Sequence, residues 1–515
     1  MSPRYKRRKN GSGKNQTCLQ NQSIISRDLT DMKIFLCNPV VGLWSVFFLG
    51  CFLLFQQLLP SPVFAGQSYY VSNSGSDKNN GLTPATAWKT IKYINSQSFQ
   101  PGSKILFKRG DTWRESLRPH SGGPEGFITY GAYGTGPKPL LLGSIDRSSP
   151  ALWTTLGGNI WYTIVVAADV GNIIFNHGDQ PCGWKKWNLS DLAAQGDYYY
   201  DVDDHIVYLY SIQNPGEIFN SIECALKKHI INESNRNYVI YDNLELKYGA
   251  AHGIGGGNTS HIIVRNCDIS FIGGAFQYYH KQTGKPVRYG NGIEFWKNAN
   301  DNLVENCKIW EIYDAAITNQ STDTCIQYAI IYRNNTIWNC EYSYEYWNRS
   351  ADSNTSNIIF ENNTCVNAGF GWSYDQRPDK RACHLYFGLT PAQTSKFIIR
   401  NNIFYQARDF AIFDNIGNRA NDQISFDGNC WYQKSSPLIY IKSINGDKTL
   451  TMQQFHSRFD ETGFTVKNSK LAKPNFVDYN NNDFRQQPDS PCLSTGRTQG
   501  KSDKLNKIRT FKMTF

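Results

Sequence analysis

The 515-residue sequence has no Cys-x-x-Cys pair, although it contains 13 cysteines. Structural zinc sites are commonly built from such pairs, so none is expected here. A basic body is also lacking. Residues 1–33 carry a formal charge of +6 and residues 497–515 carry +5, which leaves −1 of the total +10 for residues 34–496. Because the basic residues are confined to two tails, no basic stripe marks a nucleic-acid binder, and no such partner is expected.

A short pattern built around asparagine recurs through residues 237–432. It reads Ile-Tyr-Asp-Asn-Leu-Glu-Leu at 240–246 and Val-Glu-Asn-Cys-Lys-Ile at 304–309. Six copies place asparagine at 243, 266, 306, 334, 362 and 401, with separations of 23, 40, 28, 28 and 39 residues. Spacings of this size are typical of a stacked solenoid, and the alternation of apolar and polar residues has the period of a strand. The pattern predicts an all-β, right-handed parallel β-helix with one coil per copy.

The repeated asparagine suggests how the coils are joined. In each coil it is expected to occupy a turn and to stack on the asparagine of the next coil, with its amide groups bonded along the ladder. Cys267 and Cys307 fall at equivalent places in successive coils, which favours small buried ladder residues. Disulfides remain open for the ten cysteines beyond Ala65.

The N-terminal region indicates export. Residues 34–55 form an apolar run, and Val63 and Ala65 stand at the positions that a signal peptidase reads. This pattern predicts a signal peptide cut after Ala65. The alternative is an uncleaved membrane anchor, since about 20 residues span a bilayer.

The sequence from residue 66 onward resembles a known family. The run from Tyr69 to Ile91, the strand with Gly110-Asp111, and the closing stretch Pro474 to Asp478 are similar to those of the pectate-lyase-like superfamily of carbohydrate-active β-helix proteins. The resemblance implies the fold, but it leaves the reaction open, because the superfamily includes lyases, glycosidases, epimerases and non-catalytic members. A helix near Trp88 to Ser96 is expected to cap the open end of the coils.

The coil pattern stops between residues 146 and 232. Aromatic clusters there, such as Tyr198-Tyr199-Tyr200, predict short antiparallel strands in an inserted β subdomain. The resulting division is 1–65 N-terminal extension and signal peptide or anchor, 66–145 cap and first coils, 146–232 insert, 233–440 main coils, and 441–515 closing segment and basic tail.

A second strand of each coil can be aligned, and it carries the candidate chemistry. Ile254, Ile293, Ile317, Tyr344, Leu385 and Ile412 are predicted to point inward, so Glu294, Thr318, Glu345, Tyr386 and Phe413 share an outer face. Glu294 and Glu345 would lie two coils apart, about 10 Å between backbones. Asp314, in the turn before its strand, lies in the coil between them and is the third candidate catalytic carboxylate. Two carboxyl groups on one face suit glycoside hydrolysis, with one acid and one base.

Substrate contacts are predicted around these carboxyl groups. Trp296, Tyr346, Trp347 and Tyr386 lie next to the carboxylates, and two loops at 274–291 and 368–383 are expected to wall a groove. The full set of predicted contacts is His252, Lys281, Arg288, Trp296, Tyr346, Trp347, Tyr386, Trp372 and Arg377.

Two alternatives stay open at this point. One is a polysaccharide lyase that acts by β-elimination on a uronate polymer, with Lys281 or Arg288 supplying positive charge and calcium as a cofactor. No compact aspartate cluster is seen for calcium, the hydrolase needs no cofactor, and the paired aspartates of polygalacturonases are absent. The other is a non-catalytic module that binds a polysaccharide or adheres to a surface. In each case we expect a secreted or cell-envelope monomer whose partner is a polysaccharide.

Overall fold

The computed structural model describes residues 66–388, 392–416, 423–434, 439–441, 448–451, 454 and 464–496. The predicted signal peptide or anchor at 1–65 and the basic tail from 497 lie outside these residues. Among the residues described, no helix is long and apolar enough to cross a membrane.

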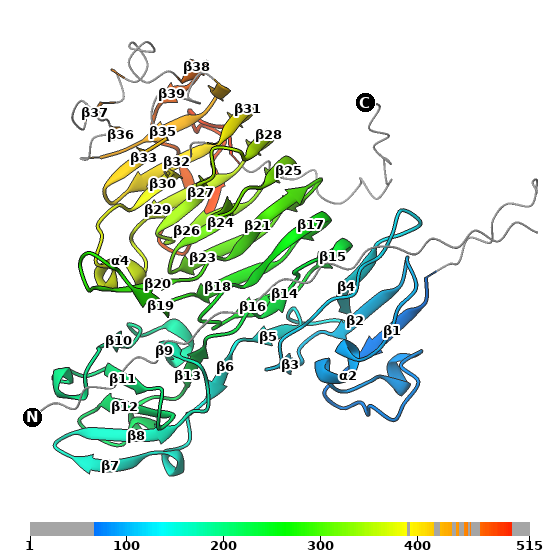
Figure 1. The fold of residues 1–515 in the computed structure, drawn as a ribbon, viewed down its shortest axis with the longest axis vertical. Coiled ribbons are helices and arrows are strands. Elements are labelled where there is room, and N and C mark those ends of the chain that lie inside the picture. The colour runs from blue at the N-terminus through cyan, green and yellow to red at the C-terminus, as the bar shows by residue number, and fades with distance from the viewer. Residues whose placement is uncertain are drawn as a thin grey trace, which may run out of the picture. The chain divides into compact units, whose positions relative to one another are not determined.

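Stacked coils of three short strands make the right-handed parallel β-helix that the repeat predicts, the architecture implied by the resemblance to the pectate-lyase-like superfamily. One complete coil consists of β25 (Ile326–Arg333), β26 (Thr336–Trp338) and β27 (Tyr342–Asn348). Each of these strands pairs in parallel with its equivalent in the next coil, β28 (Asn354–Glu361), β29 (Thr364–Ala368) and β30 (Cys383–Phe387). Figure 1 shows these successive strands side by side.

Each face of the coil is a ladder of strands. The face that carries the candidate site consists of β14 (Ile231–Asn232), the start of β17 (Ile254–Arg265), β21 (Ile293–Asn300), β24 (Ala315–Ser321), β27, β30, β33 (Phe410–Asp414) and β36 (Ile439–Ile441). The second face consists of β1 (Ser68–Val71), β2 (Lys104–Lys108), β4 (Ile128–Tyr133), β15 (Asn237–Asp242), the end of β17, β22 (Leu303–Glu305), β25, β28, β31 (Gln393–Arg400), β34 (Ile424–Asp427) and β38 (Thr465–Lys467).

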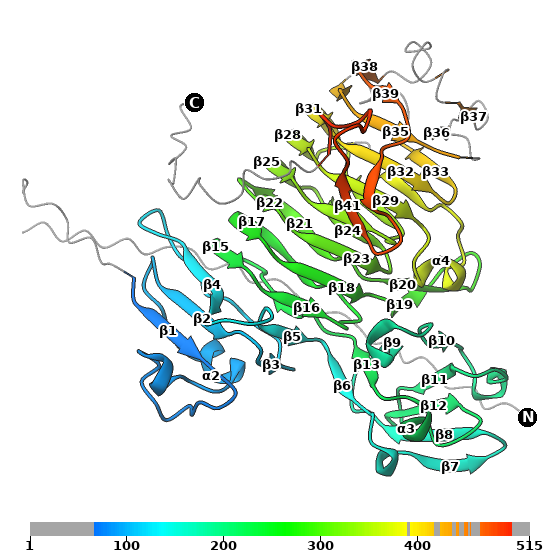
Figure 2. The same cartoon turned by 180° about the vertical axis from the view of Figure 1, so that it is seen from behind.

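The third face is a sheet of its own. It consists of β3 (Thr112–Trp113), β5 (Leu140–Leu142), β16 (Glu245–Lys247), β18 (Asp268–Ile272), β23 (Lys308–Ile312), β26, β29, β32 (Ile403–Ala407), β35 (Cys430–Tyr432) and β39 (Lys470–Leu471). The hairpin β40 (Phe476–Asp478) and β41 (Asp483–Gln486) lies in front of this sheet in Figure 2. A disulfide between Cys430 and Cys492 ties the closing segment to β35.

The asparagine ladder is real, but the prediction placed it one residue too early. The six repeated asparagines, 243, 266, 306, 334, 362 and 401, all have positive φ between 54° and 64°, so they make the turn. Asparagine tolerates this left-handed conformation better than most residues. The continuous ladder belongs to the next residue. The Asn335 amide nitrogen donates to Oδ1 of Asn363 (3.0 Å), and the Asn363 amide nitrogen donates to Oδ1 of Asn402 (3.1 Å).

Cysteines extend this buried ladder toward the N-terminus. Cys267 and Cys307 occupy the same position in their coils and are completely buried, as predicted. The main-chain N–H of Cys307 donates to Oδ1 of Asn335 (2.9 Å), so the asparagine ladder ends on a cysteine.

The N-terminal cap and the insert interrupt or close the stack of coils with structure of their own. Helix α2 (Ile91–Asn95) is capped by the Thr90 hydroxyl, and it buries Ile91 and Ile94 against the first coils. Between β5 and β14, antiparallel strands replace the coils. They form a three-stranded sheet of β6 (Ser144–Asp146), β13 (Ile222–Leu226) and β9 (Val170–Phe175), and a five-stranded sheet of β10 (Trp184–Lys185), β11 (Asp197–Asp201), β12 (Ile206–Tyr210), β8 (Ile160–Ile164) and β7 (Thr154–Gly157). Many of the aromatic residues there, including Trp153, Tyr198 and Tyr200, form a core of their own.

Replacing Asn363 with alanine is expected to lower the free energy of unfolding by about 2–4 kcal/mol, because buried ladder groups lose their partners. Asn362→Gly should cost far less, since glycine adopts the same positive φ. Urea unfolding of both variants checks this pair. If both variants lost the same free energy of unfolding, the buried amide ladder would contribute no more to stability than the turn residue beside it.

Candidate active site

The predicted outer column exists, and its register places the two glutamates as the alignment required. Gly255 pairs with Glu294, Glu294 with Thr318, Thr318 with Glu345, and Glu345 with Tyr386. The residues predicted to point inward are all completely buried in the cylinder, namely Ile254, Ile293, Ile317, Tyr344, Leu385 and Ile412. Glu294 and Glu345 therefore point out of the cylinder. They are nevertheless only 5% and 8% exposed, so neighbouring groups cover them.

Glu294 is held by a histidine and an asparagine. The main-chain N–H of Asn291 donates to Nδ1 of His252 (2.9 Å), which leaves Nε2 to carry the hydrogen that contacts Oε2 of Glu294. The Asn291 side chain donates to the same oxygen (3.4 Å). The His229 ring stacks on His252 with a centroid distance of 4.9 Å. His252 was predicted to contact substrate; its ring is turned toward Glu294, and a direct contact with sugar stays a prediction.

These contacts keep Glu294 ionised. Burial by itself raises the pKa of this carboxyl, but the electrostatic attraction of the His252 ring and its hydrogen bond outweigh burial, so the pKa lies below that of ordinary glutamate. No described residue donates a hydrogen bond to Oε1 of Glu294. One carboxylate oxygen is thus anchored, and the other is available to a ligand.

Glu345 has the opposite environment. Burial and the negative charges of Asp314 and Glu294 raise its pKa well above that of ordinary glutamate, although Arg377 offsets part of this effect. No hydrogen bond or salt bridge joins its carboxyl group to any described residue. Buried polar groups in proteins almost always have partners, so a neutral carboxyl without one is suited to an external partner.

A second carboxyl cluster surrounds Arg377. Its guanidinium lies 3.2 Å from Oδ1 of Asp314, 3.5 Å from Oε1 of Glu341 and 3.3 Å from Oδ1 of Asp379. Burial raises the pKa of Glu341 to about 8, with Arg377 opposing the rise. Burial likewise raises the pKa of Asp314. Arg377 was predicted to bind substrate, but its guanidinium is mostly engaged by these carboxyl groups.

Three of the predicted aromatic contacts lie on the outer face, and all three are half-buried. Trp296 and Trp347 follow Glu294 and Glu345 by two residues along β21 and β27, which puts each on the same side as its glutamate. The Arg349 guanidinium covers the Trp347 ring at 4.2 Å. Tyr386 continues the column past Glu345 and stacks on Phe413 at 5.1 Å.

Tyr346 and Arg288 were wrongly predicted as substrate contacts. Tyr346 directly follows Glu345 in the strand, and successive side chains point to opposite faces, so Tyr346 points into the cylinder. There it is completely buried, and its hydroxyl contacts that of Thr394 (2.8 Å). Arg288 is buried and donates to the carbonyl oxygens of Gly274 and Gly171. It therefore joins the coil to the insert instead of facing a groove.

The two predicted loops contact each other through Arg288. The hairpin of β19 (Ala275–Tyr279) and β20 (Pro286–Tyr289) meets α4 (Ser373–Gln376) where Arg288 donates to Oε1 of Gln376 (2.9 Å). Lys281 is exposed in the connection between β19 and β20. Trp372 is half-buried and donates its indole N–H to the carbonyl oxygen of Glu311 (3.0 Å). Sugar contacts by Lys281 and Trp372 stay predictions.

Sequence reasoning missed Asn291, Glu341 and the role of Thr318. Thr318 is completely buried between the two glutamates, and its hydroxyl has no hydrogen-bond partner in the described structure. The repeat alignment contained a signal for Glu341, because Ala315 pairs with Tyr342 and the residues before them, Asp314 and Glu341, are therefore equivalent. Asn291 has no such signal, since its role depends on a contact with His252.

Calcium or another metal finds no ready site among the described residues, where no group of three or more His, Cys, Asp or Glu side chains is arranged to hold one. In the insert, the turn that contains Asp201, Asp203 and Asp204 uses a carboxylate internally, because Oδ1 of Asp201 accepts the main-chain N–H groups of Asp203 and Asp204.

No protein-family model and no curated protein matches the chain. Among solved structures, it is similar to pectate lyase Pel9A, with 12% identity, a TM-score of 0.45 and coverage of 84% of this chain and 92% of that one. It is also similar to XylC in complex with xylose, with 11% identity, a TM-score of 0.44 and coverage of 79% and 83%. A GH136 lacto-N-biosidase from Eubacterium ramulus gives 13% identity, a TM-score of 0.33 and coverage of 83% and 70%. At these values the likeness carries no argument about chemistry.

Replacing each glutamate with glutamine should change the free energy of unfolding at neutral pH, with opposite signs for the two positions. Folding raises the pKa of Glu345, so its contribution to stability is complete below the unfolded pKa and is lost as the pH rises toward the folded value. Glu345→Gln should therefore stabilise the protein at about pH 7 and have less effect near pH 4. Folding lowers the pKa of Glu294, so Glu294→Gln should destabilise at neutral pH and do so less as the pH falls.

Urea unfolding of the wild type and both variants across this pH range measures the two trends. Differences that do not change with pH, or that share one sign, would contradict the assigned protonation states.

Proposed function

We propose that the chain is an exported hydrolase that cleaves glycosidic bonds of an extracellular polysaccharide, with Glu345 as general acid and Glu294 as general base. The observation that carries the proposal is the contrast between the two carboxyl groups on one outer column. One is held ionised by His252, while the other is kept protonated by burial and has no internal partner. Neighbouring carboxyl groups whose pKa values are pushed apart are the signature of an acid and base pair.

The reaction that suits this pair is direct displacement by water. Glu345 donates its proton to the glycosidic oxygen as the bond to the anomeric carbon breaks. Glu294 takes a proton from a water that attacks the same carbon from the opposite side. Two strand spacings, about 10 Å, separate the backbones of the glutamates. Inverting enzymes have carboxyl groups about 6.5–9.5 Å apart to leave room for this water, and two glutamate side chains that lean together from these backbones fit that range.

The groups around the pair support sugar binding. Trp296 lies beside Glu294 and Trp347 beside Glu345, with the Arg349 guanidinium over the Trp347 ring, and Tyr386 extends the column beyond Glu345. Tryptophan and tyrosine rings can pack on the apolar face of a sugar, while the indole N–H or the phenol hydroxyl remains free to form hydrogen bonds. The Thr318 hydroxyl lies buried in the rung between the glutamates and has no partner among the described residues. The substrate would then lie along the ladder, across successive coils.

The lyase alternative has less support. Elimination needs a basic Lys or Arg beside the substrate and a cation to neutralise the uronate. Arg288 is buried against main-chain carbonyl groups, Lys281 lies in an exposed turn, and the described residues offer no group of metal ligands. Export is supported by the apolar run at 34–55 and by the Cys430–Cys492 disulfide, since disulfides persist in oxidising compartments.

Glu345→Gln and Glu294→Gln should each lower turnover by about 10²–10⁴-fold, the usual contribution of a general acid or base, while substrate binding persists. The purified full chain is screened against a polysaccharide panel, with release of reducing ends and of unsaturated ends both recorded. Asp323→Asn, at an exposed carboxylate paired with Lys297, is the matched control and should leave turnover unchanged.

Other results of that screen would support one of the alternative functions. Unsaturated ends would identify a lyase, whereas polysaccharide binding without any product would identify a binding module. Product of the same anomeric configuration as the substrate, read by proton NMR immediately after mixing, would exclude the inverting route.

His252→Asn should shift the acid limb of the kcat/KM profile to higher pH. The base must be ionised, and loss of the imidazole removes the group that lowers the pKa of Glu294, so more of the enzyme is protonated at a given acidic pH. The alkaline limb, set by Glu345, should move much less. His205→Asn is the control, because His205 lies in the insert and has a positive φ that asparagine tolerates. An unmoved acid limb would remove Glu294 as the base.

A further inference from the structure

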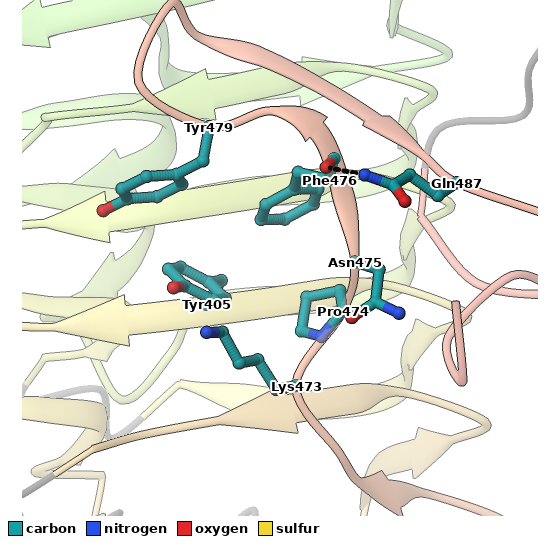
Figure 3. Close-up of a pocket in the computed structure, with 7 residues that line it drawn as sticks. All are labelled: Tyr405, Lys473, Pro474, Asn475, Phe476, Tyr479 and Gln487. Carbon is teal, nitrogen blue, oxygen red and sulfur yellow. Dashed lines mark hydrogen bonds between the residues drawn. The ribbon is translucent and has the colours of Figure 1, made fainter. Parts of the chain in front are cut away.

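A cavity of about 390 Å³ lies on a different face of the β-helix from the glutamate pair. It is formed where the closing segment crosses the third face, and it is lined by Tyr405, Lys473, Pro474, Asn475, Phe476, Tyr479 and Gln487. Its size falls within the range of small-molecule sites. Figure 3 shows the rings of Tyr405, Phe476 and Tyr479 grouped on one side and the Lys473 side chain running toward Tyr405.

The aromatic part of the cavity is a fixed platform. The Tyr405 ring on β32 contacts Phe476 and Tyr479 at centroid distances of 5.3 Å each. Tyr479 is 38% exposed, and its hydroxyl donates to Oδ1 of Asn367 (2.9 Å), which holds the ring in place across β29. Because this exposed ring is already fixed by its hydroxyl group, a ligand that packs on it does not have to immobilise the side chain, and that part of the entropy cost of binding is avoided.

The polar part of the cavity has unused hydrogen-bonding groups. The Gln487 amide nitrogen donates to the carbonyl oxygen of Phe476 (2.9 Å), while its side-chain oxygen accepts no hydrogen bond from the described residues. The Asn475 side chain has no partner there either. Amide groups both donate and accept, as sugar hydroxyl groups do, so this pair suits a polyhydroxylated ligand.

Lys473 adds one positive charge. Within the described structure its ammonium group forms no salt bridge or hydrogen bond, and its single ring contact is with Tyr432 at 5.9 Å. Lys470, three residues earlier, differs because its ammonium group donates to the carbonyl oxygen of Pro491 (3.2 Å). An ammonium group without a partner at the edge of a cavity favours an anionic group on the ligand.

We propose that this cavity is a second saccharide-binding site, separate from the glutamate pair, that takes one acidic sugar unit. The sugar ring packs on Tyr479, its hydroxyl groups bond to Asn475 and Gln487, and its carboxylate pairs with Lys473. The site anchors an acidic polysaccharide on one face while another face is free to act on it. The proposal does not depend on the reaction at Glu294 and Glu345.

The test uses the full wild-type chain, because monosaccharide probes contain no glycosidic bond that the glutamate pair could cleave. The probes are galacturonate and glucuronate, with galactose and glucose as their neutral counterparts, and binding is followed by saturation-transfer NMR and titration. Lys473→Gln should weaken binding of the acidic sugars about tenfold, the usual weight of a charge-assisted hydrogen bond, and abolish their advantage over the neutral sugars. Tyr479→Ala should weaken binding of all sugars that bind.

Lys470→Gln is the matched control, because it removes a nearby lysine that already has a partner, and it should leave binding unchanged. Lys473→Gln does not alter the packed rings, so it remains informative if Tyr479→Ala unfolds. Acidic sugars that fail to bind, that bind no better than neutral ones, or that bind equally well to Lys473→Gln would overturn the proposal. Failure of the polysaccharide screen would not, since that screen reads the glutamate pair.

Discussion

In-register stacking of the coils is the constraint on which the rest of the structure depends. Parallel strands show side chains to alternate faces, so a slip of one residue would turn every outward residue inward. The buried amide ladder of Asn335, Asn363, Asn402 and Asn429 opposes such a slip, because each amide bonds both a main-chain group and a neighbouring amide of the ladder. Unpaired amides in that position would be costly, so the ladder selects one register. Glu294 and Glu345 share a column because this register holds.

Burial turns that column into a place where two similar residues behave differently. Both glutamates leave the cylinder, yet both are almost covered, so their charges are poorly solvated. Glu294 receives a compensating histidine, whereas Glu345 has only Arg377 nearby, and this guanidinium is shared among Asp314, Glu341 and Asp379. The local supply of hydrogen-bond donors and compensating charge, and not the residue type, therefore decides which carboxyl is ionised.

The insert and the two loops are part of the frame that covers the two glutamates. Arg288 bonds main-chain carbonyl groups of the coil and of the insert, as well as Gln376 of the second loop. The buried pair of Lys185 and Asp169 reaches the hairpin, where Asp169 accepts the main-chain N–H of Phe276 (2.6 Å). These contacts hold the second loop, and with it Arg377, against the column. Residues that looked like cationic substrate contacts in the sequence are thus part of the frame that covers the site.

The amino-acid sequence by itself determined the fold, the coil boundaries, the interruption by the insert and the outward column with both glutamates. Those features follow from periodicities of two residues along a strand and of one coil along the chain, and both can be read without coordinates. The protonation states, the partnership of His252 with Glu294, the interior position of the amide ladder and the cavity beside Tyr479 were decided only by the tertiary structure. They depend on which side chains from distant coils come within a few ångströms of one another, and on how far water is excluded from them. Tyr346 is different, because the alternation of side chains along its strand already assigns it to the interior, so its prediction as a substrate contact broke the sequence rule itself.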